Sequence, residues 1–190
     1  MKFKELVDRN RSHREFKSEE TISTELIRDW LSNANHCPAA MNLQTLKYRI
    51  VNEKKEVDAL LSLTRWAAAL KKKLPPEGHG PSAFVVICHD TNLAPLKSCF
   101  MIDVGIAAQT IMLSATEAGY GGCIIGSADF EKVTELFGLS DNLTPVLVLA
   151  IGIAEDNVIL TVSDGNSTYY RDKENNHYVP KRALNDIIIS

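Results

Sequence analysis

The 190-residue sequence has no apolar run that approaches the roughly 18 residues needed to span a membrane. Its first residues, MKFKELVDRN, lack the apolar core of a secretory signal peptide. Basic and acidic residues nearly balance, 21 against 24, so the net charge of −3 gives no general attraction to nucleic acid or to an anionic membrane. These absences predict a cytoplasmic protein without a nucleic-acid or membrane partner.

The sequence also lacks the common signatures of metal and nucleotide sites. Its four cysteines, Cys37, Cys88, Cys99 and Cys123, form no CxxC or HxxC pair, so no metal site is expected. In a reducing compartment such thiols stay free, and most serve as small core residues. The Rossmann and P-loop fingerprints are both missing.

Composition and periodicity indicate one globular domain over residues 1–190, with 45% apolar and 24% charged residues. Helices are predicted over about 2–9, from the cap at Ser23 to the loop at Pro38, and over 55–73, 100–119 and 130–137. Strands are predicted around Tyr48 and Ile50, and over 83–90 and 145–154, with 158–162 left open between a strand and an irregular connection. Because strands and helices do not alternate regularly, an α+β fold is favoured over a doubly wound parallel sheet.

Two features suggest a second subunit. Apolar residues surround nearly the whole circumference of the predicted helix 100–119, and such a helix has to be buried on all sides. A chain of this length does not easily provide that burial alone. Ile187, Ile188 and Ile189 also need a burial partner, which the sheet edge of another subunit would provide.

Two basic clusters are candidate anion sites. Arg11, Ser12 and Arg14 follow the first helix, and guanidinium groups bind phosphate through paired hydrogen bonds while a hydroxyl adds a donor. Lys181 and Arg182 form the second cluster. Taken alone, such short basic clusters more often form a solvated surface than an anion site.

Two loops are candidates for holding a flat ligand. In Pro38-Ala39-Ala40-Met41-Asn42-Leu43-Gln44, small residues permit close approach to the backbone, and two side-chain amides suit the edge of a heterocycle. An ordinary helix–strand loop is the alternative. The second, Gly121-Gly122-Cys123-Ile124-Ile125-Gly126, is predicted to be a glycine-rich bend with a short strand, whose amides can donate hydrogen bonds to a ring or an anion.

In this order and at these separations, the elements resemble the nitroreductase family of flavin enzymes. The family's motifs are matched by R-S-x-R-x-F at 11–16, P-[SA]-x-x-N-x-Q at 38–44, G-Y-G-G-C-x-x-G at 119–126 and H-Y-V-P-K-R-x-L at 177–184. The resemblance covers nearly the whole chain. It implies a central, mostly antiparallel sheet flanked by helices, in a homodimer whose C-terminal arms are exchanged.

The resemblance also implies two FMN molecules per dimer, each at the subunit interface. The residues implied to hold the phosphate are Arg11, Ser12, Arg14, Lys181 and Arg182. Those implied to line the isoalloxazine are Pro38, Ala39, Ala40, Asn42 and Gln44 of the loop, from the other subunit, with Gly121, Gly122 and Cys123 near the flavin N5. NADH or NADPH would give hydride to N5 and leave, and the reduced flavin would then reduce a nitroaromatic, quinone or similar acceptor. Because the flavin supplies the redox chemistry, no catalytic side chain is expected.

The sequence departs from the family pattern at a few positions. Asn10 stands where many members have arginine, and Arg9 is able to replace that phosphate contact. Ala39 and Ala40 stand where serines are frequent. About ten residues, from Thr91 to Phe100, separate the strand 83–90 from the long helix, which predicts an open site. A flavin carrier or sensor without efficient turnover, and a flavin reductase or reductive dehalogenase, therefore stay open as alternatives. A cysteine hydrolase using Cys37 or Cys123 with His36 or another histidine is the alternative from another class.

Overall fold

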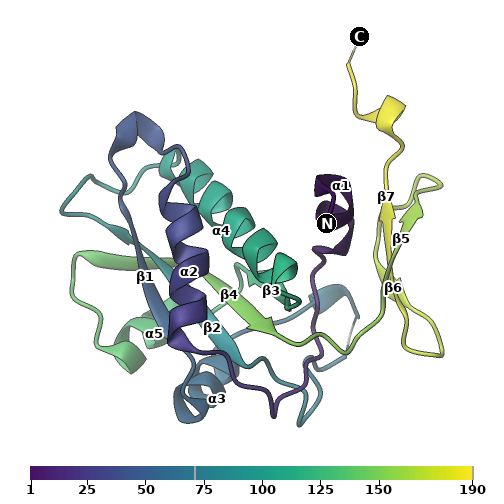
Figure 1. The fold of residues 1–190 in the computed structure, drawn as a ribbon, viewed down its shortest axis with the longest axis horizontal. Coiled ribbons are helices and arrows are strands. Elements are labelled where there is room, and N and C mark those ends of the chain that lie inside the picture. The colour runs from purple at the N-terminus through teal and green to yellow at the C-terminus, as the bar shows by residue number, and fades with distance from the viewer. Residues whose placement is uncertain (71, 190) are drawn as a thin grey trace.

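A four-stranded antiparallel sheet forms the centre of the computed structural model, which describes residues 1–70 and 72–189 (Figure 1). Its strands are β1 (Leu46–Val51), β2 (Ala83–Asp90), β3 (Gly121–Ile125) and β4 (Leu143–Gly152), in the spatial order β1-β2-β4-β3. Each neighbouring pair runs antiparallel. The predicted α+β class and antiparallel sheet are confirmed.

Helices cover both faces of this sheet (Figure 1). On one face lie α2 (Thr24–Asn35) and α4 (Phe100–Glu117), and on the other lie α3 (Lys54–Ser62) and α5 (Phe130–Phe137). The central strand β2 is buried along its whole length and sends alternate side chains to the two sides. Val85 and Ile87 join the core under α2 and α4, whereas Phe84 and Val86 join the core under α3 and α5.

The helix ends that depend on local capping chemistry are confirmed. The Ser23 side chain accepts a hydrogen bond from the Leu26 N–H and so caps α2. Asp129 caps α5 in the same way through the N–H of Lys132. Gly138, at φ 56°, ends α5 in the left-handed conformation that glycine adopts without strain.

The prediction of one helix over 55–73 is wrong in its second half. The helix α3 ends at Ser62, and Thr64 then pairs with Ala128 in an isolated β-bridge. Tertiary pairing with the segment after β3 thus overrides the helical periodicity. The three lysines expected at the end of this helix do not lie there: two are outside any helix, and Lys71 is outside the described residues.

The chain after β4 forms a second, smaller sheet. Its strands are β5 (Val158–Val162), β6 (Tyr170–Arg171) and β7 (His177–Lys181), ordered β5-β7-β6, with β5 parallel to β7. We call residues 158–189 the C-terminal arm. In Figure 1, α1 (Phe3–Arg9) stands between α4 and this arm, and the chain end points away from the central sheet. The sequence left β5 undecided and missed β6 and β7, because short strands in a polar stretch carry no clear alternation.

Apolar side chains are exposed at both places where the sequence suggests contact with a second subunit, namely the long helix and the chain end. On α4, Met101 and Ile102 are 44% and 65% exposed, although the side facing α2 and the sheet is buried. In the arm, Ile187 and Ile188 are each 60% exposed and Ile189 is 98% exposed. Burial of these side chains by a second subunit stays a prediction. Within the described residues, even α4 is not long and apolar enough to cross a membrane, and neither is any other helix.

Candidate functional site

A cavity of about 370 Å³ lies between β3, α4 and the C-terminal arm. Its volume falls in the range of roughly 300–1,000 Å³ that is typical of small-molecule sites. Arg11, Ser12, Arg14 and Lys181 all line it, so the structure brings together most of the two basic clusters. Arg182 is exposed and does not line this cavity. We call this space the basic cavity.

The cations of the basic cavity have no carboxylate partner among the described residues. The Arg11 Nη2 donates to the carbonyl oxygen of Val7 at 2.7 Å, and the Arg14 Nη1 donates to that of Ser12 at 3.1 Å. The Nε atoms of both arginines are buried without a hydrogen-bond partner. Burial lowers the pKa of the Arg11 guanidinium from its ordinary value, but an arginine remains charged at neutral pH. An anion with several acceptor oxygens would satisfy these donors.

The buried carboxylate of Asp156 holds the backbone that carries Arg14. Its side chain is fully buried, and it accepts hydrogen bonds from the His13 Nδ1 at 2.8 Å and from the Arg14 backbone N–H at 3.0 Å. Arg171 of the arm reaches the same carboxylate at 3.5 Å and also pairs with Glu15. The network therefore joins the segment after α1 to the C-terminal arm, and fixes one wall of the basic cavity against the other.

His177 supports the Arg14 side chain as a neutral imidazole. Its Nε2 lies 3.1 Å from the Arg14 Nη1, and because a guanidinium only donates, this nitrogen is the acceptor. Burial, followed by the charges of Arg14 and Arg171, lowers the pKa of His177 to about 4. Tyr169 completes the support, with its ring centroid 5.3 Å from the Arg14 Cζ.

Asn10, the departure from the family pattern, serves as a tether. Its Nδ2 donates to the Met112 carbonyl oxygen at 3.0 Å and to the Thr116 Oγ1 at 2.8 Å, so it ties the end of α1 to α4. Arg9 does not line the basic cavity, so it does not take over a phosphate contact there.

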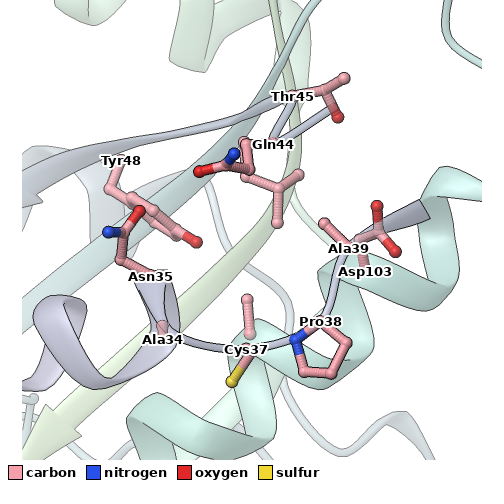
Figure 2. Close-up of a pocket in the computed structure, with 11 residues that line it drawn as sticks. Ala34, Asn35, Cys37, Pro38, Ala39, Gln44, Thr45, Tyr48 and Asp103 are labelled. Atoms are coloured by element: carbon pink, nitrogen blue, oxygen red, sulfur yellow. The ribbon is translucent and has the colours of Figure 1, made fainter. Parts of the chain in front are cut away.

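The loop that follows α2 borders a different and much smaller cavity, of about 50 Å³ (Figure 2). Pro38, Ala39 and Gln44 line it, whereas Ala40 and Asn42 do not. A space of this size holds a water molecule but no heterocycle. Burial also raises the pKa of the bordering Tyr48 hydroxyl to about 12, so it stays neutral.

Within one chain, the segment after α2 and the basic cavity lie on different sides of α4. Cys37 and Ala40 contact Thr110 and Asp103, whereas Gln109 and Met112 line the basic cavity. With 3.6 residues per turn, Gln109 and Met112 lie roughly 120° and 180° around the helix from Asp103. The structure of one chain thus brings together most of the residues implied to hold the phosphate, but does not place the implied isoalloxazine loop beside them.

The short strand predicted with the glycine-rich bend is confirmed as β3, but it already begins at Gly121. Gly121, Gly122 and Cys123 pair with Gly152, Ile151 and Ala150 of β4. Of these three β3 residues, Gly122 lines the basic cavity. A Cβ atom at Gly122 would lie 2.3 Å from the Ala150 carbonyl oxygen and 2.4 Å from the Met112 Cε, so glycine is needed where α4 crosses β3.

The cysteines lack the surroundings of a nucleophile. Cys123 is buried in the core on the side of α3 and α5, and burial raises the pKa of its thiol. The Cys37 Sγ contacts the Thr110 Oγ1 at 3.1 Å and not a histidine. Reactive thiols need a lowered pKa and access to solvent, so the geometry argues against the cysteine hydrolase. Among the residues described, no group of three or more His, Cys, Asp or Glu side chains could hold a metal ion.

Sequence reasoning missed the residues that support the basic cavity. His13, Asp156 and Arg171 form the buried network, and His177 and Tyr169 hold the Arg14 side chain. His177 stood in one motif and His13 at an unspecified position of another, and nothing marked the role of either. Asp156, Tyr169 and Arg171 lie far from Arg14 in the sequence, and no spacing rule connects them to it.

Comparison with known proteins gives a consistent answer. The family model described as the nitroreductase family matches residues 7–153. A curated relative, "Putative NAD(P)H nitroreductase YdgI" of Bacillus subtilis (strain 168), is 24% identical, over 81% of this chain and 89% of its own length.

Solved structures share the fold at low identity. A nitroreductase family protein from Streptococcus pneumoniae TIGR4 superposes with a TM-score of 0.71 at 17% identity, over 100% of both chains. A protein from Exiguobacterium sibiricum 255-15, described as a putative nitroreductase in complex with FMN, gives a TM-score of 0.70 at 22% identity, over 82% of this chain and 90% of its own.

The neutral state of His177 predicts a pH dependence of stability. The folded protein lowers the pKa of His177 from 6.5 to about 4, so between these values only the unfolded chain takes up the proton. Stability from this group is complete above about pH 6.5 and is lost as the pH falls toward 4, by up to about 2 kcal/mol between pH 7 and 5. Urea unfolding at both pH values should show a smaller loss in His177→Gln than in the wild type. The exposed His36→Gln is the control, and equal losses in all three proteins would contradict the prediction.

Proposed function

The chain belongs to the nitroreductase family, and on that premise we propose that it is an FMN-dependent NAD(P)H oxidoreductase that works as a homodimer. The observation that carries this proposal is the basic cavity. It gathers three cations and a hydroxyl around a ligand-sized space, and leaves two buried guanidinium nitrogens without partners.

The chain's own residues fit the phosphate of FMN. Arg11 and Arg14 present donors that no carboxylate of the described residues neutralises, and Lys181 adds a point charge from the other wall. A phosphate has enough acceptor oxygens for all of them, and charge-assisted hydrogen bonds of this kind are the strong ones. Arg182 lies outside the cavity, so in this proposal it contributes only weak long-range attraction.

A second copy of the chain would complete the site. Ile124 is 42% exposed on the cavity wall and offers an apolar surface for a flat ring. The loop 38–44 lies on another side of α4 of the same chain, so we assign the ring contacts to the loop of the partner. The exposed apolar side chains of α4 and of the arm's end are the surfaces that such a dimer would bury.

Bound FMN would supply the redox chemistry, accepting hydride from NADH or NADPH at N5 and then passing electrons to a nitroaromatic, a quinone or a similar acceptor. The protein's part is to anchor the phosphate, to hold the ring between two chains and to leave one face open to the substrates. Only Thr91–Cys99 connect β2 to α4, so the connection is short and adds no helix above the site.

A flavin carrier or sensor is the second candidate function. It is favoured by Asn10, whose amide is engaged with α4, so that this position adds no charge to the basic cavity. The two functions differ in whether a nicotinamide reduces the bound flavin quickly.

The enzyme function predicts a yellow protein with one FMN per chain. Titration with FMN should saturate at that ratio, and stopped-flow mixing with NADH or NADPH should bleach the flavin absorbance within seconds. A nitroaromatic or a quinone should then restore the colour. A colourless protein that takes up no FMN would overturn the proposal, and FMN binding without reduction would favour the carrier or sensor.

The phosphate role of Arg14 predicts a loss of FMN affinity in Arg14→Ala. Losing a charged hydrogen bond should weaken binding by about 1.5–3 kcal/mol, measured by fluorescence titration. Arg28→Ala, at an exposed position on α2, is the matched control, and Arg182→Ala should weaken binding less than Arg14→Ala. Unchanged FMN affinity in Arg14→Ala would refute the phosphate role.

The exchanged arm predicts a weaker dimer when its end is removed. Deleting residues 187–190 removes three exposed isoleucines that a partner would bury, so the dissociation constant of the dimer should rise in sedimentation experiments. Serines at 187–189 keep the chain length and should act in the same direction. A dimer that sediments unaltered in both variants rules out the contribution of the arm's end.

A further inference from the structure

The buried carboxylate of Asp103 on α4 anchors the turn at residues 40–44 through a hydrogen bond to its backbone. Asp103 lies in the first turn of α4 and is 6% exposed. Both of its oxygens accept from the backbone N–H of Ala40, each at 3.1 Å. Among the described residues it forms no ion pair, so this amide is its hydrogen-bond partner. Figure 2 shows the carboxylate next to Ala39, at the start of the turn.

The turn needs such support because its backbone is strained. Met41, Asn42 and Gln44 have φ values of 51°, 54° and 50°, in the left-handed region that side chains other than glycine and asparagine seldom adopt. Met41 is also 78% exposed, so packing does not hold it in place. The remaining bonds are local: the Gln44 Nε2 donates to the carbonyl and side-chain oxygens of Asn42, both at 3.3 Å. Contacts within a turn do not fix it relative to the body of the protein, whereas the Ala40–Asp103 hydrogen bond does.

We propose that Asp103 is a positioning residue for the flavin, because it anchors at Ala40 the turn that presents Asn42 and Gln44 to the flavin ring of the other subunit. This inference rests on the proposed function, and it adds to that function a residue that positions the ring contacts. The phosphate is held by one subunit, and the ring contact is held in place by a carboxylate inside its partner. A change at Asp103 in one chain therefore acts on the flavin anchored by the other chain.

The first test is FMN affinity. Asp103→Ala removes the anchor and should weaken FMN binding by about 10- to 100-fold, the size expected for a lost charged hydrogen bond. Asp103→Asn keeps one acceptor oxygen without the charge, so its affinity should lie between the two. Ser114→Ala is the control, since Ser114 accepts a bond from the Asn33 Nδ2 on α2 and makes no contact with the turn. It should bind FMN as the wild type does.

The visible spectrum of bound FMN separates positioning from simple stability. A displaced turn should change the band shape of the flavin in saturated Asp103→Asn, at temperatures where thermal melts show the protein folded. If Asp103→Asn binds FMN with wild-type affinity and spectrum, the inference is overturned. If the wild type takes up no FMN, the proposed function falls and this inference falls with it, so the two failures are distinguishable.

A mixed dimer gives the decisive result. Arg14→Ala damages the phosphate half of a site, and Asp103→Ala damages the ring half. In a dimer of one chain of each kind, purified through two different tags, one site carries both defects and the other carries neither. The mixed dimer should bind one FMN with wild-type affinity, at flavin concentrations where neither parent homodimer binds. Absence of this recovery, with both parents folded, would overturn the inference.

Discussion

The fully buried carboxylate of Asp156 is the interaction on which the basic cavity depends. It joins His13 and the Arg14 backbone, which follow α1, to Arg171 in the arm. A charge taken out of water is costly unless it is paired and hydrogen-bonded, and here three donors from two distant segments meet that need. The same pairing leaves the Arg14 side chain free of carboxylates. The Asp156 carboxylate is thus bonded to His13, the Arg14 backbone and Arg171, and the side chains of Arg11 and Arg14 remain available to a ligand.

The helix α4 sets the second constraint, because it connects the two halves of the proposed flavin site. Asp103 and Thr110 contact the segment after α2, whereas Gln109 and Met112 line the basic cavity on another side of the helix. A rigid helix does not bring these two sides together within one chain. The exposed Met101 and Ile102 on the same helix offer an apolar surface for a second copy. Separation around α4 and exposure on α4 therefore support the same proposal, a site divided between two chains.

Local chemistry explains which elements were predictable. Two helices begin at the capping residues Ser23 and Asp129, and α5 ends at Gly138. Each of these bonds spans three or four residues, so the local sequence contained the whole cause. The strand β2 was equally predictable, since the run AFVVICHD is mostly apolar, as a strand buried on both faces requires. The helix expected over 55–73 failed because Thr64 pairs with Ala128, more than sixty positions away. The strand predicted after the glycine-rich bend begins earlier than expected for a related reason, since Gly121–Cys123 already pair with β4.

The same distinction between local and long-range causes applies to the candidate site. The sequence alone identified Arg11, Ser12, Arg14 and Lys181 as candidate phosphate-binding residues, because residue type fixes what a side chain can donate and the order of the motifs indicated the family. Only the tertiary structure decided that Lys181 lines the basic cavity while Arg182 does not, and that Asp156, His177 and Asp103 hold the binding segments. These three residues act through hydrogen bonds to groups more than sixty positions away, and such contacts exist only once the chain has folded.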